Sequence, residues 1–508
     1  MDTEMSISER YWRLSLYEMD AALGHHPLIA PELAPPPVKL YPDAARHQLA
    51  SRIPRRLEAA GPSNVDTLST LLYYTYGYGR ADVTATDLTL HRLVPSARCL
   101  YPAELYVWVP PDDSAPAGLH YYDPAHHSLV TLRPGIDSSM LASAVPADLA
   151  GAAYVLVVTA LFWKVAHRYG DYGYRLCTQE VGVVVGNVLA VAAAMGLRGH
   201  VHHQFVDEPV RRWLDLTAGE ESPMVLVPLY SSRDSSRECV HPTVNGSSVD
   251  AAGPIWRRSS PLDQRVCAPF LELDAASRFT TTTQIASPPE RGPQRPAGHA
   301  VSTPPAPADE PIADLVAALR GRASGPAYFN ASGLPVPAEV LWCVCRYAQS
   351  PHVSDAAAPG QLAVGMMVAV NRVTGLAPGS YAVLPDGALE QVRAGPVADP
   401  LARAAGHPFT VNFETANVVV SIVGDPAATA HWLGDRGYRV LNAEAGIVAQ
   451  RVCLASAAAG LVARPYNSYR AEAVAELLGI SGTGLVPIFQ IAVGRPRVTG
   501  TVSLPMAP

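Results

Sequence analysis

Three side chains that could carry or move protons lie close together in the first half of the chain: Lys164, Arg168 and Tyr169. Lys164 and Arg168 are four positions apart, so in a helix they would share one face. An arginine stays protonated in proteins and is a poor base, whereas a lysine or a tyrosine can act as one. Two candidate bases therefore stay open: Lys164, and Tyr169 with its phenolate favoured by Arg168.

A metal centre is the other chemistry that the residue types suggest. The run His200-Val201-His202-His203 could chelate a metal ion, but we find no complete ligand set around it. The seven cysteines show no Cys-x-x-Cys spacing, and Cys343-Val344-Cys345 would be a poor chelate by itself. We therefore expect no metal site and read the cysteines as reduced thiols.

The chain repeats itself. Residues 172–182 and 436–446 share Gly-Tyr-Arg, a glutamate and a glycine at a constant separation of 264 residues, and the pair Gly196-Leu197 recurs as Gly460-Leu461 at the same separation. A constant separation without a slip indicates a tandem duplication of one domain. The proton-handling residues are not repeated, because Arg168-Tyr169 corresponds to Trp432-Leu433.

Hydrophobic patterning predicts the same order of elements in both halves. The first half is predicted to contain a helix over 66–79, strands over 105–109, 118–122, 154–158 and 224–229, and a long helix over 175–197. The second half is predicted to contain a helix over 337–347 with Pro337 in its first turn, strands over 366–370, 379–382, 418–423 and 485–493, and a long helix over 439–461.

Composition limits what the long helices and the chain ends can be. The apolar stretch 181–197 is slightly short for a membrane span, and its repeat over 447–461 contains Gln450 and Arg451, so we expect each helix to be buried in a core or packed on its twin. We expect an N-terminal extension over 1–50, domains over 51–232 and 311–508, and a Ser/Thr/Pro-rich linker over 233–310, part of which docks around Trp256 and Phe270. With a net charge of −7 and no apolar signal core, the chain is expected to be cytoplasmic, without nucleic-acid or membrane partners.

The most specific sequence motif in the chain is Pro95-Ser96-Ala97-Arg98-Cys99-Leu100-Tyr101-Pro102-Ala103-Glu104-Leu105-Tyr106. It resembles the flavin-contacting segment of the FMN-dependent nitroreductase fold, and most of all its SagB-type branch of azoline dehydrogenases. Arg98 stands where that branch usually has glycine. The segment Pro37-Val38-Lys39-Leu40-Tyr41-Pro42 is similar to an element that precedes the domain in the same branch.

The resemblance implies an α+β fold of two tandem nitroreductase-like domains, each a mixed, mostly antiparallel sheet flanked by helices, paired within one chain as a pseudo-dimer. It implies FMN as the cofactor, with its phosphate held by Arg320, Arg322, Ser324, Arg495 and Arg497 and its ring edge met by Arg464, Pro465, Tyr466 and Asn467. Pro95, Ser96, Ala97 and Arg98 would contact the flavin from the other half. Each intact element survives in only one half, so we expect one composite flavin site and one decayed site.

The same resemblance implies a reaction and partners. It implies an FMN-dependent oxidase that converts azolines to azoles in a ribosomally made precursor peptide, acting beside a cyclodehydratase, with Lys164, Arg168 and Tyr169 at the catalytic centre. Two alternatives stay open. One is a nitroreductase-type or carrier-bound-peptide flavin oxidoreductase, and the other is a non-catalytic, peptide-binding scaffold of the same fold.

Overall fold

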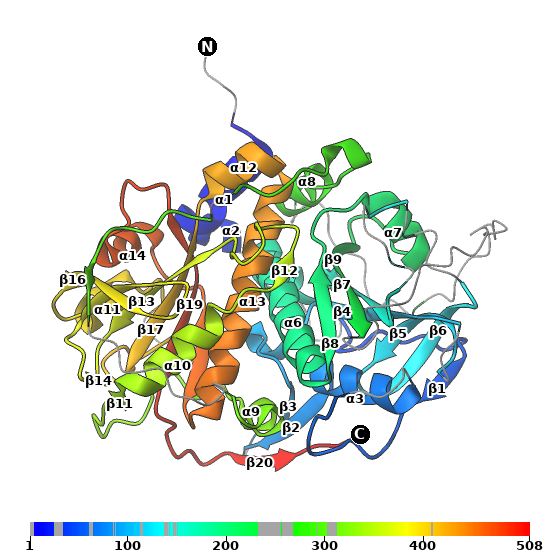
Figure 1. Cartoon of the computed structure of the whole chain (residues 1–508), viewed down its shortest axis with the longest axis horizontal. Coiled ribbons are helices and arrows are strands. Elements are labelled where there is room, and N and C mark those ends of the chain that lie inside the picture. The colour runs from blue at the N-terminus through cyan, green and yellow to red at the C-terminus, as the bar shows by residue number, and fades with distance from the viewer. Residues whose placement is uncertain are drawn as a thin grey trace.

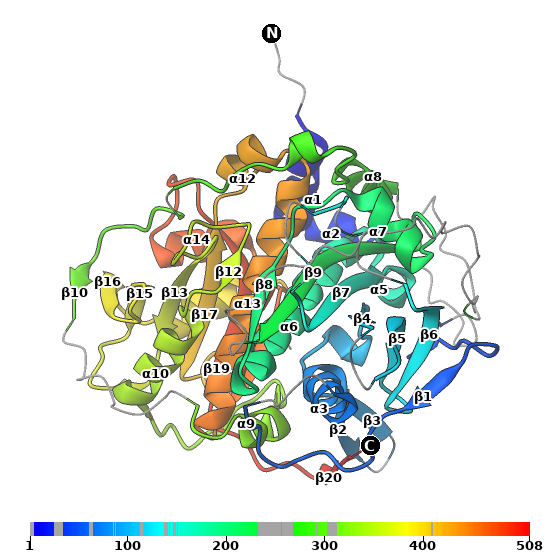
Figure 2. The ribbon, with the colours of Figure 1, turned by 45° about the vertical axis from the view of Figure 1, so that its right-hand side comes forward.

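The computed structural model describes residues 5–24, 34–59, 64–84, 86, 88–111, 115–136, 141, 143–145, 149, 151–231, 256, 268–290, 292–301, 312–407 and 410–507. The two halves of this chain lie side by side, each built around one sheet, with two long helices between the sheets (Figures 1 and 2). The described part of the N-terminal extension adds the edge strand β1 (Arg46–Gln48) to the first sheet, and that of the linker adds β10 (His299–Ala300) to the second.

The two large sheets repeat each other strand by strand. The first has the order β1-β6-β5-β4-β7-β9-β8-β12 and the second β10-β16-β15-β13-β17-β19-β18. Pairing is antiparallel throughout, apart from the parallel pair β8–β12, so the predicted mixed, mostly antiparallel sheet is confirmed. The strands of the first sheet are β1 Arg46–Gln48, β4 Ala103–Val109, β5 Gly118–Asp123, β6 Ser128–Pro134, β7 Tyr154–Leu161, β8 Leu197–Val201, β9 Glu221–Ser231 and β12 Val353–Ser354. Those of the second are β10 His299–Ala300, β13 Gly365–Val370, β15 Gly379–Val383, β16 Leu389–Ala394, β17 Val418–Gly424, β18 Val462–Tyr466 and β19 Val486–Gly494.

Two long helices, α6 Gly173–Ala194 and α13 Arg436–Ala458, form the centre of the molecule. They meet at the repeated glycines: a Cβ on Gly182 would lie 1.9 Å from the carbonyl oxygen of Ala443, and one on Gly446 would lie 2.1 Å from that of Gln179. Only glycine permits such a backbone contact. The stretch from Trp163 to Ala194 is long and apolar enough for a membrane span, yet 89% of its most apolar window is buried inside the protein, as expected for a helix packed on its twin.

The remaining helices lie on the outer faces of the two sheets, against the sides of the central pair and at its ends (Figures 1 and 2). They are α1 Ile7–Tyr17, α2 Met19–Leu23, α3 Val65–Tyr76, α5 Trp163–Tyr169, α7 Asp207–Leu214, α8 Ala268–Ala276, α9 Leu315–Gly321, α10 Ala338–Ala348, α11 Ala398–Ala404, α12 Pro426–Leu433 and α14 Ala471–Leu478. The predicted long helices, α3, α10 and the large strands are all found, with shifts of a few residues at their ends. Pro337 precedes α10 as its N-cap, so its predicted place in the first turn is wrong.

Two further segments tie the halves together. The C-terminal strand β20 Val502–Pro505 leaves the second half and pairs with β2 Tyr78–Val83, which pairs with β3 Leu88–Arg92 in the first half. Within the linker, Phe270 of α8 is fully buried against Phe162 and Tyr174, so this part of the linker docks as expected. The predicted docking of Trp256 is supported by its position over the Lys39 ammonium, 5.0 Å from the ring centroid.

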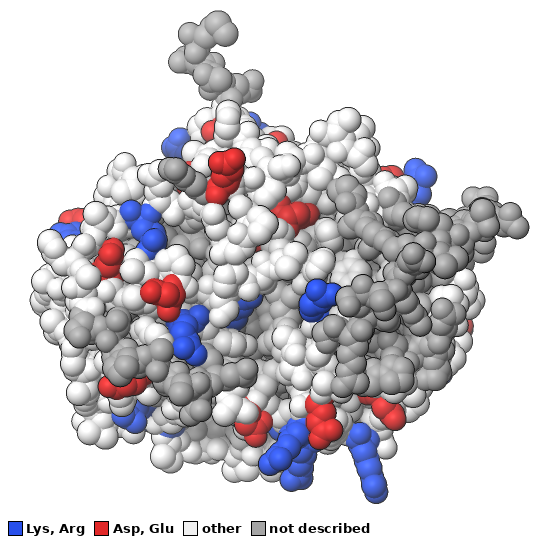
Figure 3. Space-filling view, viewed as in Figure 1, with Lys and Arg blue, Asp and Glu red and all other residues white. Residues whose placement is uncertain are grey.

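The visible surface carries acidic and basic side chains interspersed among uncharged ones, without a continuous basic stripe (Figure 3). The two lysines of the chain, Lys39 and Lys164, are both 1% exposed, so arginine supplies the positive charge at the surface.

Candidate functional site

The Pro-Ser-Ala segment forms a tight turn held in a strained conformation. The Tyr101 N–H donates to Ser96 Oγ at 2.8 Å, and the Ala97 N–H donates to Glu180 Oε1 at 2.7 Å. Arg98, Cys99 and Tyr101 have φ of 51°, 57° and 47°, a left-handed region that favours glycine. The backbone thus keeps a conformation suited to glycine at Arg98, and the surrounding hydrogen bonds hold it there.

Arg322 brings the second half of the chain to this turn. It lies just after α9, is 4% exposed and interacts electrostatically with Cys99 and Tyr101. Its backbone carbonyl accepts a hydrogen bond of 2.9 Å from Arg80 in β2. Its Nε and Nη1 are buried without a partner, and burial lowers its pKa. A buried guanidinium with free donors is suited to a phosphate or another anion.

The loop at the end of β18 reaches the same place. Asn467 donates to Gln179 Oε1 at 2.6 Å, directly before Glu180 in α6. The Asn467 Oδ1 and Tyr466 hydroxyl atoms are buried without partners. Arg464 donates to the carbonyl of Gly325 at 2.8 Å and so supports the segment that follows Arg322, while Pro465 is half-buried.

The other predicted phosphate residues are placed less uniformly. Arg320 is half-buried over the rings of Tyr73 and Tyr74, with its Nε buried and unpartnered, and Ser324 is half-buried two residues after Arg322. Arg495 donates to the carbonyl of Pro335 at 2.9 Å, and Arg497 is exposed. The contacts therefore join Arg322 to the turn, whereas the roles of Arg495 and Arg497 stay predictions.

The proton-handling residues lie at the end of α5, beside the turn. Tyr169 contacts Arg98, which comes from the turn, whereas Arg168 is exposed and is the weakest of the influences on Tyr169. Burial is the largest influence and raises the pKa of Tyr169, whereas Arg98 and, more weakly, Arg168 act in the opposite direction. The catalytic roles of Tyr169 and Arg168 stay predictions.

Lys164 is buried rather than presented to a substrate. Its ammonium donates to Glu104 Oε1 at 2.5 Å and to the carbonyls of Pro37 and Tyr101 at 3.0 and 3.3 Å. These bonds use its three donors. Burial lowers its pKa. The geometry therefore gives Lys164 a positioning role, in which it supports the carbonyl of Tyr101 at the end of the turn.

Glu180 is a site residue that the sequence showed as part of the repeat but did not assign to the site. Its carboxylate accepts from Ala97, and it interacts with Ser96 and with the Tyr169 hydroxyl. Burial raises its pKa to about 7, so it can hold or release a proton near neutrality. The occurrence of a glutamate at equivalent positions in both halves was the feature of the sequence that could have pointed to Glu180 as a site residue.

The position equivalent to Glu180 in the second half, Glu444, is occupied by contacts with other residues of the chain. Glu444, the repeat partner of Glu180, accepts from Ser354 Oγ at 2.8 Å and contacts His203 and His352 at 2.8 and 3.3 Å. In the first sheet, strand β12 pairs with β8 and becomes the edge strand. In the second sheet, β18 is the counterpart of β8 and is itself the edge strand among the described residues. His203 of the predicted His-x-His-His run thus bonds to a carboxylate.

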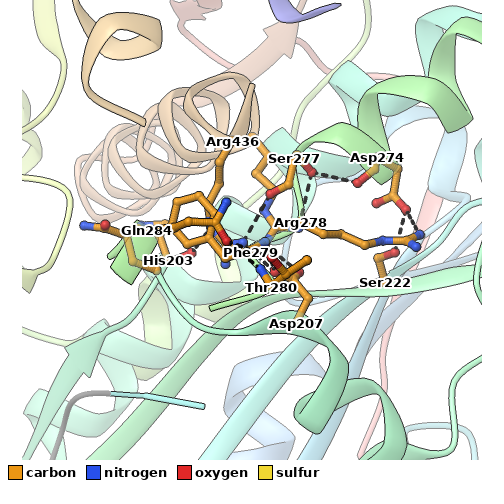
Figure 4. A network of polar contacts seen from close by, with 12 residues as sticks. His203, Asp207, Ser222, Asp274, Ser277, Arg278, Phe279, Thr280, Gln284 and Arg436 are labelled. Atoms are coloured by element: carbon orange, nitrogen blue, oxygen red, sulfur yellow. Dashed lines mark hydrogen bonds and ion pairs between the residues drawn. The ribbon is translucent and has the colours of Figure 1, made fainter. Parts of the chain in front are cut away.

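A polar network next to this position fixes the linker (Figure 4). Arg436 at the start of α13 donates to Asp207 at 2.6 Å and to the carbonyls of His203 and Ser277 at 2.8 and 3.2 Å. Asp207 also accepts from the Phe279 N–H at 2.8 Å. The segment after α8 is therefore tied to both halves over the second long helix.

Similarity to known proteins identifies the family of the chain. The sequence profile of the nitroreductase family matches residues 385–495. The chain is 31% identical over 175 residues to a protein of Methanocaldococcus jannaschii named as a nitroreductase, covering 82% of that protein and 34% of this chain. The chain belongs to the nitroreductase family. Members of the nitroreductase family are flavin oxidoreductases that typically bind FMN.

Solved structures extend the likeness to the whole chain. A protein of Anabaena variabilis described as a nitroreductase superposes with a TM-score of 0.74 at 23% identity, covering 97% of this chain and all of that one. This likeness shows that both halves have the nitroreductase fold. A chain of the Escherichia coli microcin synthetase complex with truncated pro-microcin bound is 19% identical, and the match covers 38% of this chain and 70% of that chain. The TM-score of this match is 0.29.

Proposed function

We propose that the protein is an FMN-dependent oxidase that binds one flavin per chain and oxidises azoline rings of a precursor peptide to azoles. The observation that carries the flavin site is the meeting of Arg322 from the second half with the Ser96 turn of the first. Azoline as the ring substrate is supported by the likeness of residues 95–106 and 37–42 to the azoline dehydrogenase branch.

The residues at the turn fit FMN on physical grounds. The dianionic phosphate would take the unpartnered donors of Arg322 and Arg320. The ring system carries polar edges, which suit the unpartnered Asn467 Oδ1 and Tyr466 hydroxyl. At the equivalent position, Glu444 contacts His203, His352 and Ser354, whereas Glu180 accepts from the backbone of the turn.

In azoline oxidation, a bound FMN would supply the hydride acceptor, and the protein must take the proton from the adjacent carbon. We assign that proton to the Glu180 carboxylate, because its pKa of about 7 suits a base near neutral pH. Tyr169 lies between Arg98 and Glu180 by its interactions and would orient the substrate and hold the carboxylate in place. Lys164 would keep the turn in position through its hydrogen bond to the carbonyl of Tyr101.

The peptide assignment also places the protein in a sequence of reactions. An azoline is made by a cyclodehydratase acting on cysteine, serine or threonine side chains, so a cyclodehydratase is the proposed partner. We expect both proteins to act in the cytoplasm, where precursor peptides are made.

The test has two arms. Protein purified with its bound cofactor is denatured, and the released flavin is counted against the chain; we expect one FMN per chain. An azoline-containing peptide is then added in air, and mass spectrometry should show the loss of two hydrogen atoms per ring without any nicotinamide. Turnover only with NAD(P)H and a nitroaromatic would replace the proposal by a nitroreductase, and a colourless, inactive protein would leave a peptide-binding scaffold.

A further inference from the structure

A cysteine, a histidine and an aspartate form a chain of contacts beside the turn. Cys99 Sγ lies 3.4 Å from His91 Nδ1, and His91 Nε2 lies 2.9 Å from Asp82 Oδ2. Cys99 belongs to the short 3-10 helix of the turn, Asp82 to β2 and His91 to β3. All three residues are half-buried, and Asp82 and His91 lie on paired strands.

The contacts define which nitrogen carries the proton. A carboxylate accepts hydrogen bonds, so the 2.9 Å contact with Asp82 places the imidazole proton on Nε2. Nδ1 then carries the lone pair and faces the Cys99 thiol, as a general base must. This is the arrangement of an activated nucleophile: the thiol, a base in contact with it, and a third group that orients the base.

Asp82 is itself held in place from two sides. Its Oδ1 accepts from Arg80 Nε at 2.9 Å and from the hydroxyl of Ser503 at 2.6 Å. Ser503 lies on β20, so the C-terminal strand of the second half completes the support. Although burial opposes it, these bonds lower the pKa of Asp82 and keep the carboxylate ionised.

The second half also supplies a positive charge at the thiol. The unpartnered, 4%-exposed guanidinium of Arg322 interacts with Cys99, and with His91 on the other side. A donor of this kind stabilises a negative charge that develops on sulfur or on a carbonyl oxygen next to it. Of the other described cysteines, Cys177, Cys345 and Cys453 are buried and Cys343 is half-buried.

From these contacts we propose that Cys99 is a nucleophile, with His91 as its base and Asp82 as the orienting group, that takes an acyl group from a thioester or activated ester. Sγ forms a bond to the carbonyl carbon as the thiol proton passes to His91 Nδ1. The bond from that carbon to the leaving sulfur or oxygen then breaks, and His91 returns the proton to the leaving atom. The product is an acyl thioester on Cys99, and nothing is oxidised or reduced.

Titration of the neighbours sets the expected pH dependence. Burial is the largest influence on both groups: it raises the pKa of Cys99 and lowers the pKa of His91. The charged or titratable groups that face them are Tyr101, Glu180, Arg322, Arg80 and Asp82. At neutral pH the pair is therefore a thiol beside a neutral imidazole, and reactivity should fall when acid protonates His91.

The inference rests on the contacts of Cys99, His91 and Asp82, none of which the proposed flavin site uses, and it shares Arg322 with the proposed phosphate site. The first experiment alkylates the purified protein, with its cofactor, using iodoacetamide and measures each cysteine by mass spectrometry. Cys343 is the matched control, since it is also half-buried and has a raised pKa for the same main reason, burial. We expect Cys99 to react about a hundredfold faster than Cys343 or more, since a positioned base typically contributes about 10²–10⁴-fold.

The second experiment offers p-nitrophenyl acetate. We expect a burst of one nitrophenolate per chain and an acetyl group on Cys99. Cys99→Ser should abolish the burst, His91→Gln and Asp82→Asn should slow it by about tenfold or more, and Cys343→Ser should leave it unchanged. Equal alkylation of Cys99 and Cys343, or an unchanged burst in His91→Gln, would overturn the proposal. If His91→Gln does not fold, Asp82→Asn and the acid limb of the wild-type rate provide the same test, and flavin retention is read separately.

Discussion

Replacing Glu180 by glutamine tests the electrostatics of the composite site with almost no change in size. Burial raises the pKa of Glu180 to about 7, against the opposing effect of its bonds to Ser96 and Ala97. In an unfolded chain a glutamate has a pKa of about 4.3. The folded protein therefore keeps this proton through a pH range in which the unfolded chain has released it.

The difference between the folded and unfolded pKa values sets the sign and size of the pH dependence of the free energy of unfolding. A carboxyl group with a raised folded pKa contributes stability below its unfolded pKa and loses it as the pH rises through its folded pKa. A rise of two to three pKa units corresponds to about 3 kcal/mol, at ~1.4 kcal/mol per unit. Glu180→Gln keeps an oxygen for the Ala97 N–H and never ionises. Its free energy of unfolding, relative to wild type, should therefore rise by up to about 3 kcal/mol between about pH 4.5 and about pH 8.

The assay is urea unfolding of both proteins at several pH values in this range, with the same flavin content in each. Glu444→Gln is the matched control at the equivalent repeat position. Although burial by itself acts the other way, His352 and His203 hold the pKa of Glu444 well below its usual range. Glu444→Gln should therefore destabilise the protein without any gain at higher pH. A pH-independent difference for Glu180→Gln, or the same trend in both variants, would refute the reasoning.

Further outcomes are expected from four other changes. Arg322→Ala and Arg320→Ala should each weaken FMN retention in a dialysis assay, Arg322→Ala more strongly because this guanidinium is buried with free donors, and an unchanged flavin content in both would remove the phosphate assignment. Tyr169→Phe should slow azoline turnover severalfold and leave the flavin bound, and full activity would show that its hydroxyl has no role. Gly182→Ala should lower the stability by more than about 3 kcal/mol, or prevent folding, because its Cβ would lie 1.9 Å from a backbone oxygen of α13; a thermal melt like that of wild type would contradict the close helix contact.

The sequence by itself determined the duplication, the order of elements in each half and the pairing of the long helices. These are local properties or repeated ones. Alternating and helical periodicities reflect burial on one face, and the repeated Gly182 and Gly446 mark the contact of two backbones, so each leaves a trace in the linear text. The resemblance of the segment around Ser96 added the cofactor expectation, and the family comparison agrees with it at the level of a flavin oxidoreductase.

Only the tertiary structure decided what each side chain faces. Lys164 and Arg168 share a helix in the sequence, yet one is buried on Glu104 and the other is exposed. Glu180 and Glu444 are equivalent in the repeat, yet burial outweighs the opposing bonds and the Arg92 charge and raises the pKa of the first, while two histidines from distant loops lower that of the second. The contact of Cys99 with His91 and the approach of Arg322 likewise join segments that are far apart or differently oriented in the chain. Electrostatic environment depends on distances through space, and a sequence of residues does not contain those distances.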